Sequence, residues 1–243
     1  MTYCVGMMLN RGLVLMSDTR TNSGVDNISV FRKMHHWSNG ERVVAVMTAG
    51  NLATTQSVVS QLEERSKAPA DRHNTVLEAP TMFQVATVVG KLLRDTIHSR
   101  QVDNGQEGSS QFTASIILAG QIKGMEPRLF LIYPEGNFIE ASFDTPFFQI
   151  GETKYGRPII LRGYDRDMTF EDAVKLLMVS FDSTIKANLS VGLPLDMLVL
   201  ERDRFEPLHE RRIDGQDPYY SEVSTNWGEA LKQAFQSLPP YSF

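Results

Sequence analysis

The sequence predicts a single α+β domain, in which blocks of strands alternate with blocks of helices. Short apolar runs bounded by turns indicate strands in residues 3–48 and 112–142, and helical signals follow residues 51, 81 and 169. A chain of 243 residues is long enough for one sizeable core, but a second independent core would leave both halves small. Residues 1–243 are therefore expected to form one domain.

The opening segment is predicted to consist of strands separated by turns. The predicted strands span residues 3–9, 13–17, 28–37 and 42–48. Residues 10–12 form a turn after the first strand, and Asn39 with Gly40 is a strong hairpin signal between the last two. The apolar spacing becomes helical from Asn51, so we expect a strand to pass into a helix at Gly50.

The middle of the chain is predicted to hold two helices and a second set of strands. The helices end near Arg65 and run from about Thr81 to Arg100, and residues 67–80, which contain two prolines, are interpreted as an exposed connection. A polar loop at residues 101–111 precedes strands at 112–120, 129–133 and 138–142. These strands are expected to belong to a second sheet.

The last third begins with a helix signal at Thr169. This threonine is a favourable N-cap and is followed by Glu171 and Asp172, which suit the unsatisfied N–H groups of a first turn, so the helix is expected to continue to about Ala187. A final core strand is predicted at residues 195–201. Residues 202–243 are interpreted as an extension, with a short helix at 229–238, that packs on this domain or on a neighbouring subunit.

Composition excludes several classes of protein. The net charge of −5 and scattered Lys and Arg residues argue against nucleic acid as a partner. No apolar run approaches the roughly 18 residues that cross a membrane. The single cysteine, Cys4, cannot form an intrachain disulfide and fits a reducing, cytoplasmic setting. His35 and His36 are adjacent and would point to opposite faces of a strand, so no metal site is expected.

Thr2 is a candidate nucleophile. No signal or propeptide precedes it in this sequence, and removal of Met1 would leave its hydroxyl beside a free α-amine. Such an amine has a pKa of about 7.7–8.0, close enough to neutrality to accept the hydroxyl proton during attack. Cys4 would share the strand face of Thr2, but exposing it requires the loss of three residues, so it is interpreted as a buried structural thiol.

Further residues follow Thr2 in a recognisable order. They are Gly12 in a tight turn, Ser17-Asp18-Thr19-Arg20 after a strand, Lys33, and Thr48-Ala49-Gly50 before a helix. This pattern resembles the β-subunits of the proteasome, which are N-terminal-nucleophile hydrolases. Because the likeness begins at Thr2 and continues through Phe31-Arg32-Lys33-Met34-His35, the sequence is most similar to the bacterial group called Anbu, the ancestral β-subunit. The likeness covers roughly the first 200 residues.

The resemblance implies a four-layer αββα sandwich of two antiparallel sheets covered by helices. It also implies catalytic roles. Thr2 would be the nucleophile, Lys33 would lower the pKa of the Thr2 amine, and Asp18 would hold Lys33 in place. Gly50 would donate a backbone N–H to the oxyanion of the attacked carbonyl. Taken singly, each residue also has an ordinary structural reading, as a turn acid, a solvated strand lysine or a strand-to-helix corner.

The later part of the family pattern is altered. Glu152 stands where proteasome β-subunits carry a serine, and residues 188–192 replace an Asp-x-x-Ser-Gly motif, so that either Asn188 matches the aspartate or Ser190 matches the serine. Ser190 is therefore a candidate for the network near the α-amine. The resemblance also places Thr21, Phe31, Thr48 and Leu52 near the pocket for the substrate side chain, which predicts an apolar, fairly small space.

The expected function is that of a threonine-type peptidase acting on peptides or unfolded protein. By the same resemblance it needs no cofactor, assembles with copies of itself into a ring or an open spiral, and can work with an ATP-dependent unfoldase. Two alternatives stand beside it. One is a small-molecule amidase or acylase that uses the same threonine, and the other is an inactive assembly subunit, suggested by Glu152 and the altered stretch at residues 188–192.

Overall fold

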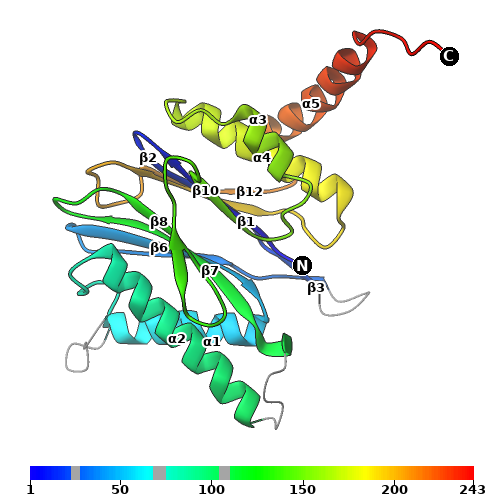
Figure 1. The fold of residues 1–243 in the computed structure, drawn as a ribbon. Coiled ribbons are helices and arrows are strands. Elements are labelled where there is room, and N and C mark those ends of the chain that lie inside the picture. The colour runs from blue at the N-terminus through cyan, green and yellow to red at the C-terminus, as the bar shows by residue number, and fades with distance from the viewer. Residues whose placement is uncertain (23–27, 68–74, 104–109) are drawn as a thin grey trace.

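The computed structural model describes residues 1–22, 28–67, 75–103 and 110–243, and two five-stranded antiparallel sheets form its centre (Figure 1). The first sheet has the order β10 (Phe147–Gly151), β1 (Tyr3–Leu9), β2 (Gly12–Asp18), β11 (Leu195–Glu201) and β12 (His209–Ile213). The second has the order β5 (Met34–Ser38), β6 (Arg42–Gly50), β7 (Ala114–Ile122), β8 (Arg128–Ile132) and β9 (Phe138–Glu140). A small ribbon pairs β3 (Arg20–Asn22) with β4 (Ile28–Val30).

Helices cover the outer face of each sheet (Figure 1). The second sheet is covered by α1 (Leu52–Lys67) and α2 (Met82–Asp103), and the first by α3 (Arg157–Gly163) and α4 (Phe170–Ala187). A short 3-10 turn, η1 (Ser110–Phe112), precedes β7, and α5 (Pro218–Gln236) packs against α4. This arrangement confirms the predicted αββα sandwich.

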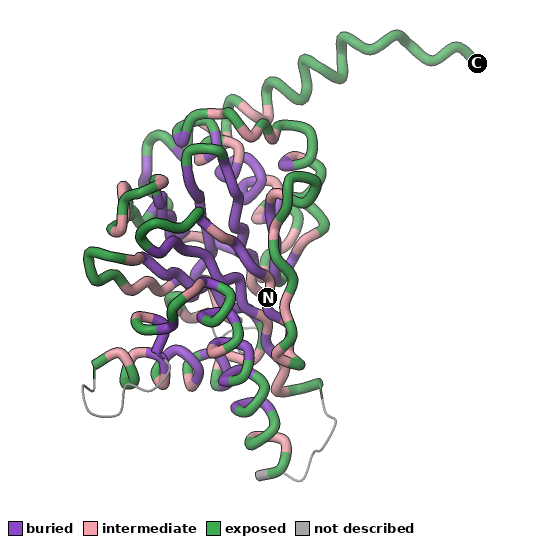
Figure 2. The backbone as a smooth tube through the Cα atoms, turned by 60° about the vertical axis from the view of Figure 1, so that its left-hand side comes forward, coloured by how far each residue is buried: buried purple, intermediate pink, exposed green. Residues whose placement is uncertain are grey.

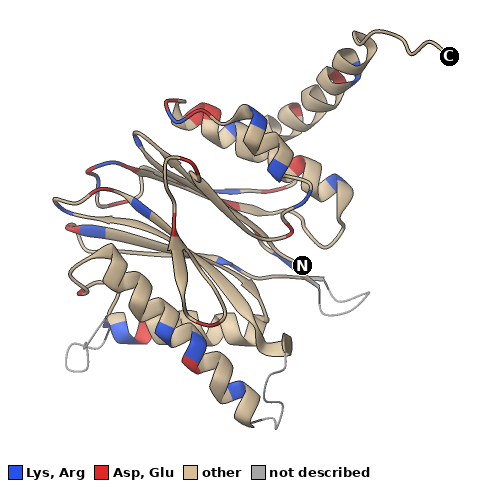
Figure 3. Ribbon diagram, viewed as in Figure 1, with Lys and Arg blue, Asp and Glu red and all other residues tan. Residues whose placement is uncertain are grey.

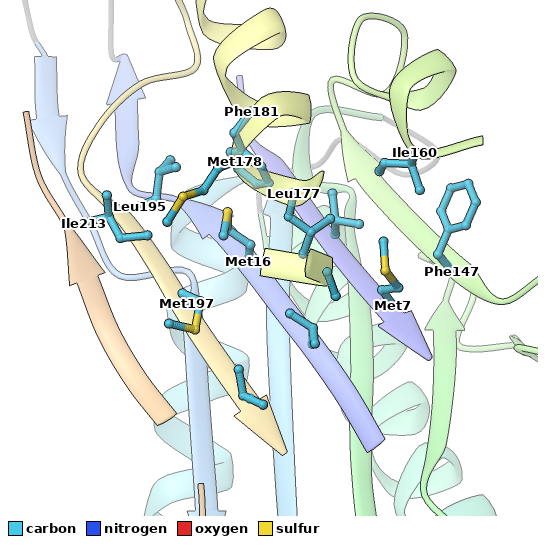
Figure 4. Packing of buried hydrophobic residues seen from close by; sticks show 14 of the residues in the cluster. Met7, Met16, Phe147, Ile160, Leu177, Met178, Phe181, Leu195, Met197 and Ile213 are labelled. Carbon is cyan, nitrogen blue, oxygen red and sulfur yellow. The ribbon is translucent and has the colours of Figure 1, made fainter. Parts of the chain in front are cut away.

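Side chains of β1 alternate between two of the three apolar clusters. Tyr3, Val5 and Met7 lie in the cluster between the first sheet and its helices, part of which Figure 4 displays. Cys4 and Met8 lie in the cluster between the two sheets. Because successive strand residues point to opposite faces, a strand between two layers is buried throughout, as β1 is (Figure 2). The third cluster lies between the second sheet and α1 and α2.

The predicted strand at residues 28–37 is wrong as a single element. The structure divides it into β4 and β5, with residues 31–33 between them outside any strand. Phe31 donates its N–H to the Thr19 carbonyl at 2.9 Å, and the Lys33 carbonyl accepts the Thr48 N–H at 3.0 Å. Residues 31–33 thus connect the β3–β4 ribbon to the edge of the second sheet.

Other elements differ from the sequence-based prediction. The strands β10 and β12 and the helix α3 were not predicted. The connection predicted at residues 67–80 lies partly outside the described residues, but its described part is not simply exposed, since Val76 and Ala79 are buried against α1 and α2. Residues 104–109 of the predicted polar loop also lie outside the described residues.

The C-terminal extension is more ordered than the sequence indicated. Its helix begins at Pro218 instead of near residue 229, because the Asp217 side chain caps it by accepting the Tyr220 N–H at 2.9 Å. Tyr220 and Val223 pack into the cluster beneath α4. Beyond them α5 projects from the sandwich, and its outer half is exposed (Figures 1 and 2). No helix in the described part of the chain is long and apolar enough to cross a membrane.

The pairing of β1 with β10 fixes the start of the chain. Tyr3 lies opposite Gly151, and the Glu152 N–H donates to the Thr2 carbonyl at 2.7 Å. Gly151 has φ +85, and a Cβ atom placed on it would lie 1.9 Å from the Thr2 carbonyl oxygen. Only glycine combines this left-handed backbone with so close an approach to Thr2.

We predict that Gly151→Ala lowers the free energy of unfolding by more than about 3 kcal/mol, because the β-carbon would push Thr2 off β10. Gly40→Ala is a matched control, since Gly40 has a similar φ of +79 with no atom within 4 Å of the added carbon, and should cost about 1 kcal/mol. Chemical denaturation of both variants measures the difference. Equal losses would show that the contact with Thr2 imposes no constraint.

Candidate active site

A buried ion pair joins Asp18, at the end of β2, to Lys33, just before β5. The Lys33 Nζ lies 2.7 Å from the Asp18 Oδ1, and the two side chains are 6% and 0% exposed. The same Nζ donates to the Arg20 carbonyl at 2.6 Å. The Tyr3 N–H also donates to the Asp18 Oδ1, at 2.9 Å. One carboxylate therefore holds both the lysine and the residue next to Thr2.

The environment of Asp18 acts on its pKa in two directions. Burial raises the pKa of the Asp18 carboxyl, because the charged form is removed from water, while the Lys33 ammonium and the backbone N–H groups of Tyr3 and Gly192 act to lower it. Removing one partner of a buried pair typically destabilises a protein by about 3–5 kcal/mol, since an uncompensated charge remains inside. Asp18 and Lys33 are therefore expected to act as a unit.

Thr2, Lys33 and Gly50 line one pocket of about 260 Å³. Its other lining residues are Met1, Thr21, Arg32, His35, Thr48, Ala49, Leu52, Thr55, Gln56 and Val59. Thr21, Thr48 and Leu52 line the same pocket as Thr2, and their role toward a substrate side chain stays a prediction. Phe31, which the resemblance also placed there, does not line this pocket, whereas its neighbour Arg32 does.

The pocket differs in character from the apolar space expected from the sequence. His35 and Gln56 bring polar groups into its wall, and Arg32 lines it as well, although the Arg32 guanidinium lies near Glu210, outside this pocket. His35 could have been found from the sequence, because residues two apart on an extended segment share a face and His35 follows Lys33 at that spacing. Arg32 could not, because its position depends on the break between β4 and β5.

The α-amine of the chain as described belongs to Met1, which is 60% exposed and also lines the pocket. Burial lowers the pKa of this amine, the Lys33 charge lowers it further, and Asp18 raises it. The Thr2 nitrogen is an amide while Met1 is attached, so it cannot accept a proton. Loss of Met1 would give Thr2 the free amine and open the pocket.

Gly50 ends β6 with φ +117. A Cβ atom at Gly50 would lie 2.4 Å from the Thr113 carbonyl oxygen, at the point where β6 pairs with β7. Glycine is therefore required here by the sheet itself, and not only by an approaching substrate. Asn51 then caps α1 by accepting the Thr54 N–H at 2.9 Å.

The two positions that depart from the family pattern contact each other. The Asn188 side-chain amide donates to the Glu152 Oε2 at 3.0 Å, and the Asn188 Oδ1 accepts the Ser190 N–H at 3.0 Å. Glu152 also holds Thr2 through its own backbone N–H. Ser190 does not line the pocket. Sequence reasoning treated Glu152 and Asn188 as separate departures, although they form one bonded pair.

The remaining polar candidates occupy structural positions. Cys4 is fully buried, its thiol lies 3.8 Å from the Thr48 carbonyl oxygen, and burial raises the pKa of this thiol. His35 lines the pocket, whereas the His36 Nε2 lies 4.0 Å from a Glu210 carboxylate oxygen. Among the described residues, no group of three or more His, Cys, Asp or Glu side chains could hold a metal ion.

Comparison with known proteins identifies the family of the chain. The family model described as "Proteasome subunit" matches residues 2–199. The solved structure of Anbu (ancestral beta-subunit) from Yersinia bercovieri is 44% identical, with a TM-score of 0.92, and that of Anbu from Hyphomicrobium sp. strain MC1 is 48% identical, with a TM-score of 0.90; both matches cover 100% of each chain.

Two further relatives extend the comparison. "Helical Assembly of the Anbu Complex from Pseudomonas aeruginosa" contains a chain that is 41% identical with a TM-score of 0.92, and the match covers 99% of the present chain and 98% of that one. "Proteasome subunit beta" of Methanopyrus kandleri is 21% identical over 214 residues, which are 88% of this chain and 93% of the relative. The chain therefore belongs to the proteasome subunit family of N-terminal-nucleophile hydrolases, within which it is most similar to the Anbu (ancestral β-subunit) group.

Proposed function

We propose that this chain is a self-assembling threonine peptidase that cleaves amide bonds in peptides or unfolded protein, with Thr2 as the nucleophile after Met1 is removed. The observation that carries the proposal is the buried pair of Lys33 and Asp18 at the wall of the pocket that Thr2 lines. A lysine charge that is fixed in place and shielded from water acts most strongly on a neighbouring amine.

The proposed reaction uses Thr2 as both nucleophile and base. Its amine takes the hydroxyl proton as Oγ attacks the substrate carbonyl, and the oxyanion that forms accepts a hydrogen bond from the Gly50 N–H. The resulting ammonium gives its proton to the leaving nitrogen, which departs and leaves an ester on Thr2. A water molecule, which loses a proton to the amine, then attacks the ester, and Oγ recovers its proton on release.

Lys33 and Asp18 have distinct roles in this proposal. The Lys33 charge disfavours a second positive charge on the Thr2 amine and so keeps it a base near neutral pH. Asp18 is a positioning residue, which fixes Lys33 and, through the Tyr3 N–H, the strand that carries Thr2. Ser190 is kept as a candidate for the surrounding network only, because its backbone N–H orders Asn188 beside Glu152. No cofactor takes part.

We propose that copies of the chain assemble through the outer half of α5. An apolar stripe runs along this helix from Tyr220 through Val223, Leu231 and Phe235. Its first half packs on the domain, whereas Leu231 and Phe235 are 51% and 76% exposed. An apolar stripe that extends beyond the part of the helix packed on the domain indicates that the exposed part binds another surface. A second copy is the occupant we propose, because the Anbu complex from Pseudomonas aeruginosa, whose chain is covered over 98% of its length, is described as a helical assembly.

The substrate and setting follow from the same proposal. Enclosure of the pocket within a ring or open spiral would restrict access to peptides and unfolded chains, and an ATP-dependent unfoldase is the partner that would supply them. Charged residues of both signs are interspersed along the helices and strand ends (Figure 3). Cys4 is a free, buried thiol, which is compatible with the cytoplasm that we propose as the site of action.

One observation also favours an alternative. Glu152 bonded to Asn188 replaces the serine and aspartate of the family pattern, so the chain could be an inactive assembly subunit or an amidase for small molecules. The inactive subunit would form no covalent intermediate on Thr2. The amidase would cleave a small amide and leave peptides intact.

We predict that the purified native protein lacks Met1. An electrophilic peptide should then add its mass to Thr2, because the free Thr2 amine lies next to the hydroxyl and can activate it. Intact-mass and peptide mass spectrometry measure both events. Thr2→Ala should abolish the adduct, and Thr2→Ser should retain it. Ser29→Ala lies outside the pocket and serves as an unaffected control.

Two results would count against this mechanism. Retention of Met1 on the native protein would leave Thr2 without a free amine. Complete loss of Met1 without any adduct in the wild type would favour the inactive subunit.

We predict that the double variant Leu231→Ser with Phe235→Ser sediments as a single chain of about 27 kDa, whereas the wild type sediments as a larger assembly. The substitutions remove exposed apolar surface and leave the buried start of α5 intact. Gln233→Ser with Gln236→Ser changes the opposite face of α5 and should assemble normally. If the apolar double variant assembles as the wild type does, the outer half of α5 is not the interface.

A further inference from the structure

Removal of Met1 would leave Thr2 as the first residue of the chain, with no residue before it to hold it in place. Chain ends are poorly ordered unless they are tied down. The Thr2 carbonyl accepts the Glu152 N–H at 2.7 Å, and the next residue, Tyr3, donates its N–H to the Asp18 Oδ1 at 2.9 Å. The place of the proposed nucleophile therefore depends on how firmly Tyr3, the first residue of β1, is held.

The side chain of Tyr3 is anchored by hydrogen bonds that reach three other segments. Its hydroxyl oxygen lies 2.7 Å from the Ser180 Oγ on α4, and the Gln149 Nε2 on β10 donates to it at 2.6 Å. The Ser180 Oγ donates to the Gly156 carbonyl, just before α3, at 3.1 Å. Tyr3 and Ser180 are fully buried, and Gln149 is 8% exposed. These four residues form the Tyr3 network.

The donors and acceptors of the Tyr3 network follow one consistent direction. The Gln149 amide nitrogen can only donate, so the Tyr3 oxygen accepts from it and directs its own hydrogen to Ser180. The Ser180 hydrogen is then directed to the Gly156 carbonyl, which can only accept. Burial raises the pKa of Tyr3 to about 12, so the phenol keeps its hydrogen near neutral pH.

Gly156 leaves the space that the Tyr3 hydroxyl occupies. A Cβ atom at Gly156 would lie 2.1 Å from the Tyr3 hydroxyl oxygen and 2.3 Å from the Ser180 Oγ. The Gly156 backbone has φ −85 and ψ −27, which any residue can adopt, so its conformation does not require glycine. The Tyr3 ring packs on Phe181 with ring centroids 4.4 Å apart. A phenylalanine ring could make this apolar contact too, so core packing alone does not explain the hydroxyl.

We propose that the Tyr3 network positions the Thr2 nucleophile, with the Tyr3 hydroxyl as its central group. Buried polar groups that satisfy one another rigidify a core and select one geometry. Tyr3 is held at two points, because Asp18 accepts its N–H while Ser180 and Gln149 bond its hydroxyl. The inference rests on the proposed function and adds a positioning residue to it. Tyr3 does not line the pocket, so it acts on the reaction through Thr2.

The test compares Tyr3→Phe with Tyr164→Phe in protein free of Met1. Tyr164 is a matched control, because its hydroxyl donates to the Met8 carbonyl at 2.6 Å, at the far end of β1 from Thr2. Tyr3→Phe should lower kcat for a reporter peptide about ten- to hundredfold and leave KM unchanged, because a small displacement of the attacking oxygen slows the reaction without weakening substrate binding. Tyr164→Phe should keep the wild-type kcat and KM.

Ser180→Ala interrupts the same network at its next bond and should lower kcat as Tyr3→Phe does. The double variant of Tyr3→Phe with Ser180→Ala should be no slower than the slower single variant, because both changes break one chain of bonds. A double variant slowed by the product of the two single effects overturns the inference. A wild-type kcat in Tyr3→Phe, or an equal fall in kcat in Tyr164→Phe, also overturns it.

An exchange measurement separates failure of the inference from failure of the proposed function. Absence of any turnover or Thr2 adduct in the wild type would contradict the proposed function, and hydrogen exchange of the amide at position 3 then tests the network alone. This amide should exchange about tenfold faster in Tyr3→Phe than in the wild type and at the wild-type rate in Tyr164→Phe, because only the first change loosens the bond to Asp18. Unchanged exchange in Tyr3→Phe overturns the inference.

Discussion

The buried pair of Lys33 and Asp18 is the interaction on which the rest of the site depends. Asp18 ends a strand of one sheet and Lys33 precedes the edge strand of the other, so the pair links the two halves of the sandwich where Thr2 emerges. Desolvation opposes the burial of two charges, and here it is offset by a short contact and by the hydrogen bonds with the Arg20 carbonyl and the Tyr3 N–H. A buried ion pair often contributes no more stability than apolar residues of similar volume would, so stability alone does not explain it. The task we assign to it is control of the Thr2 amine.

Thr2 is held from both sides of its strand. Its carbonyl accepts the Glu152 N–H, and the next peptide nitrogen, that of Tyr3, donates to Asp18. Gly151 permits the first contact because no larger residue fits beside the Thr2 carbonyl. Glu152 and Asn188, which depart from the proteasome pattern, then form a bonded pair of their own. The altered residues therefore contact each other, and they lie beside Thr2, the proposed nucleophile.

Local signals in the sequence predicted most of the fold. The Thr169 cap and the Asn39-Gly40 hairpin each depend on neighbouring residues, and both elements formed as expected. The strand β12 was not predicted because most of its residues are charged and exposed, and it forms a strand through its pairing with β11. The start of α5 carried a readable signal in Asp217 and Pro218. The residues around Thr2 were recognised by their spacing. The position of Arg32 at the pocket was not, because it follows from the break between β4 and β5, which no local sequence pattern encodes.

We propose that Lys33 lowers the pKa of the Thr2 α-amine, and an NMR titration of this amine in protein free of Met1 tests this effect directly. The account predicts a pKa below the ordinary range of about 7.7–8.0, so that the amine is a neutral base at and above pH 7 and activity falls as acid protonates it. It also predicts a rise in this pKa in the double variant Asp18→Asn with Lys33→Met, which removes both charges and leaves no unpaired ion. A pKa at or above the ordinary range, or one that the double variant leaves unchanged, would contradict the account.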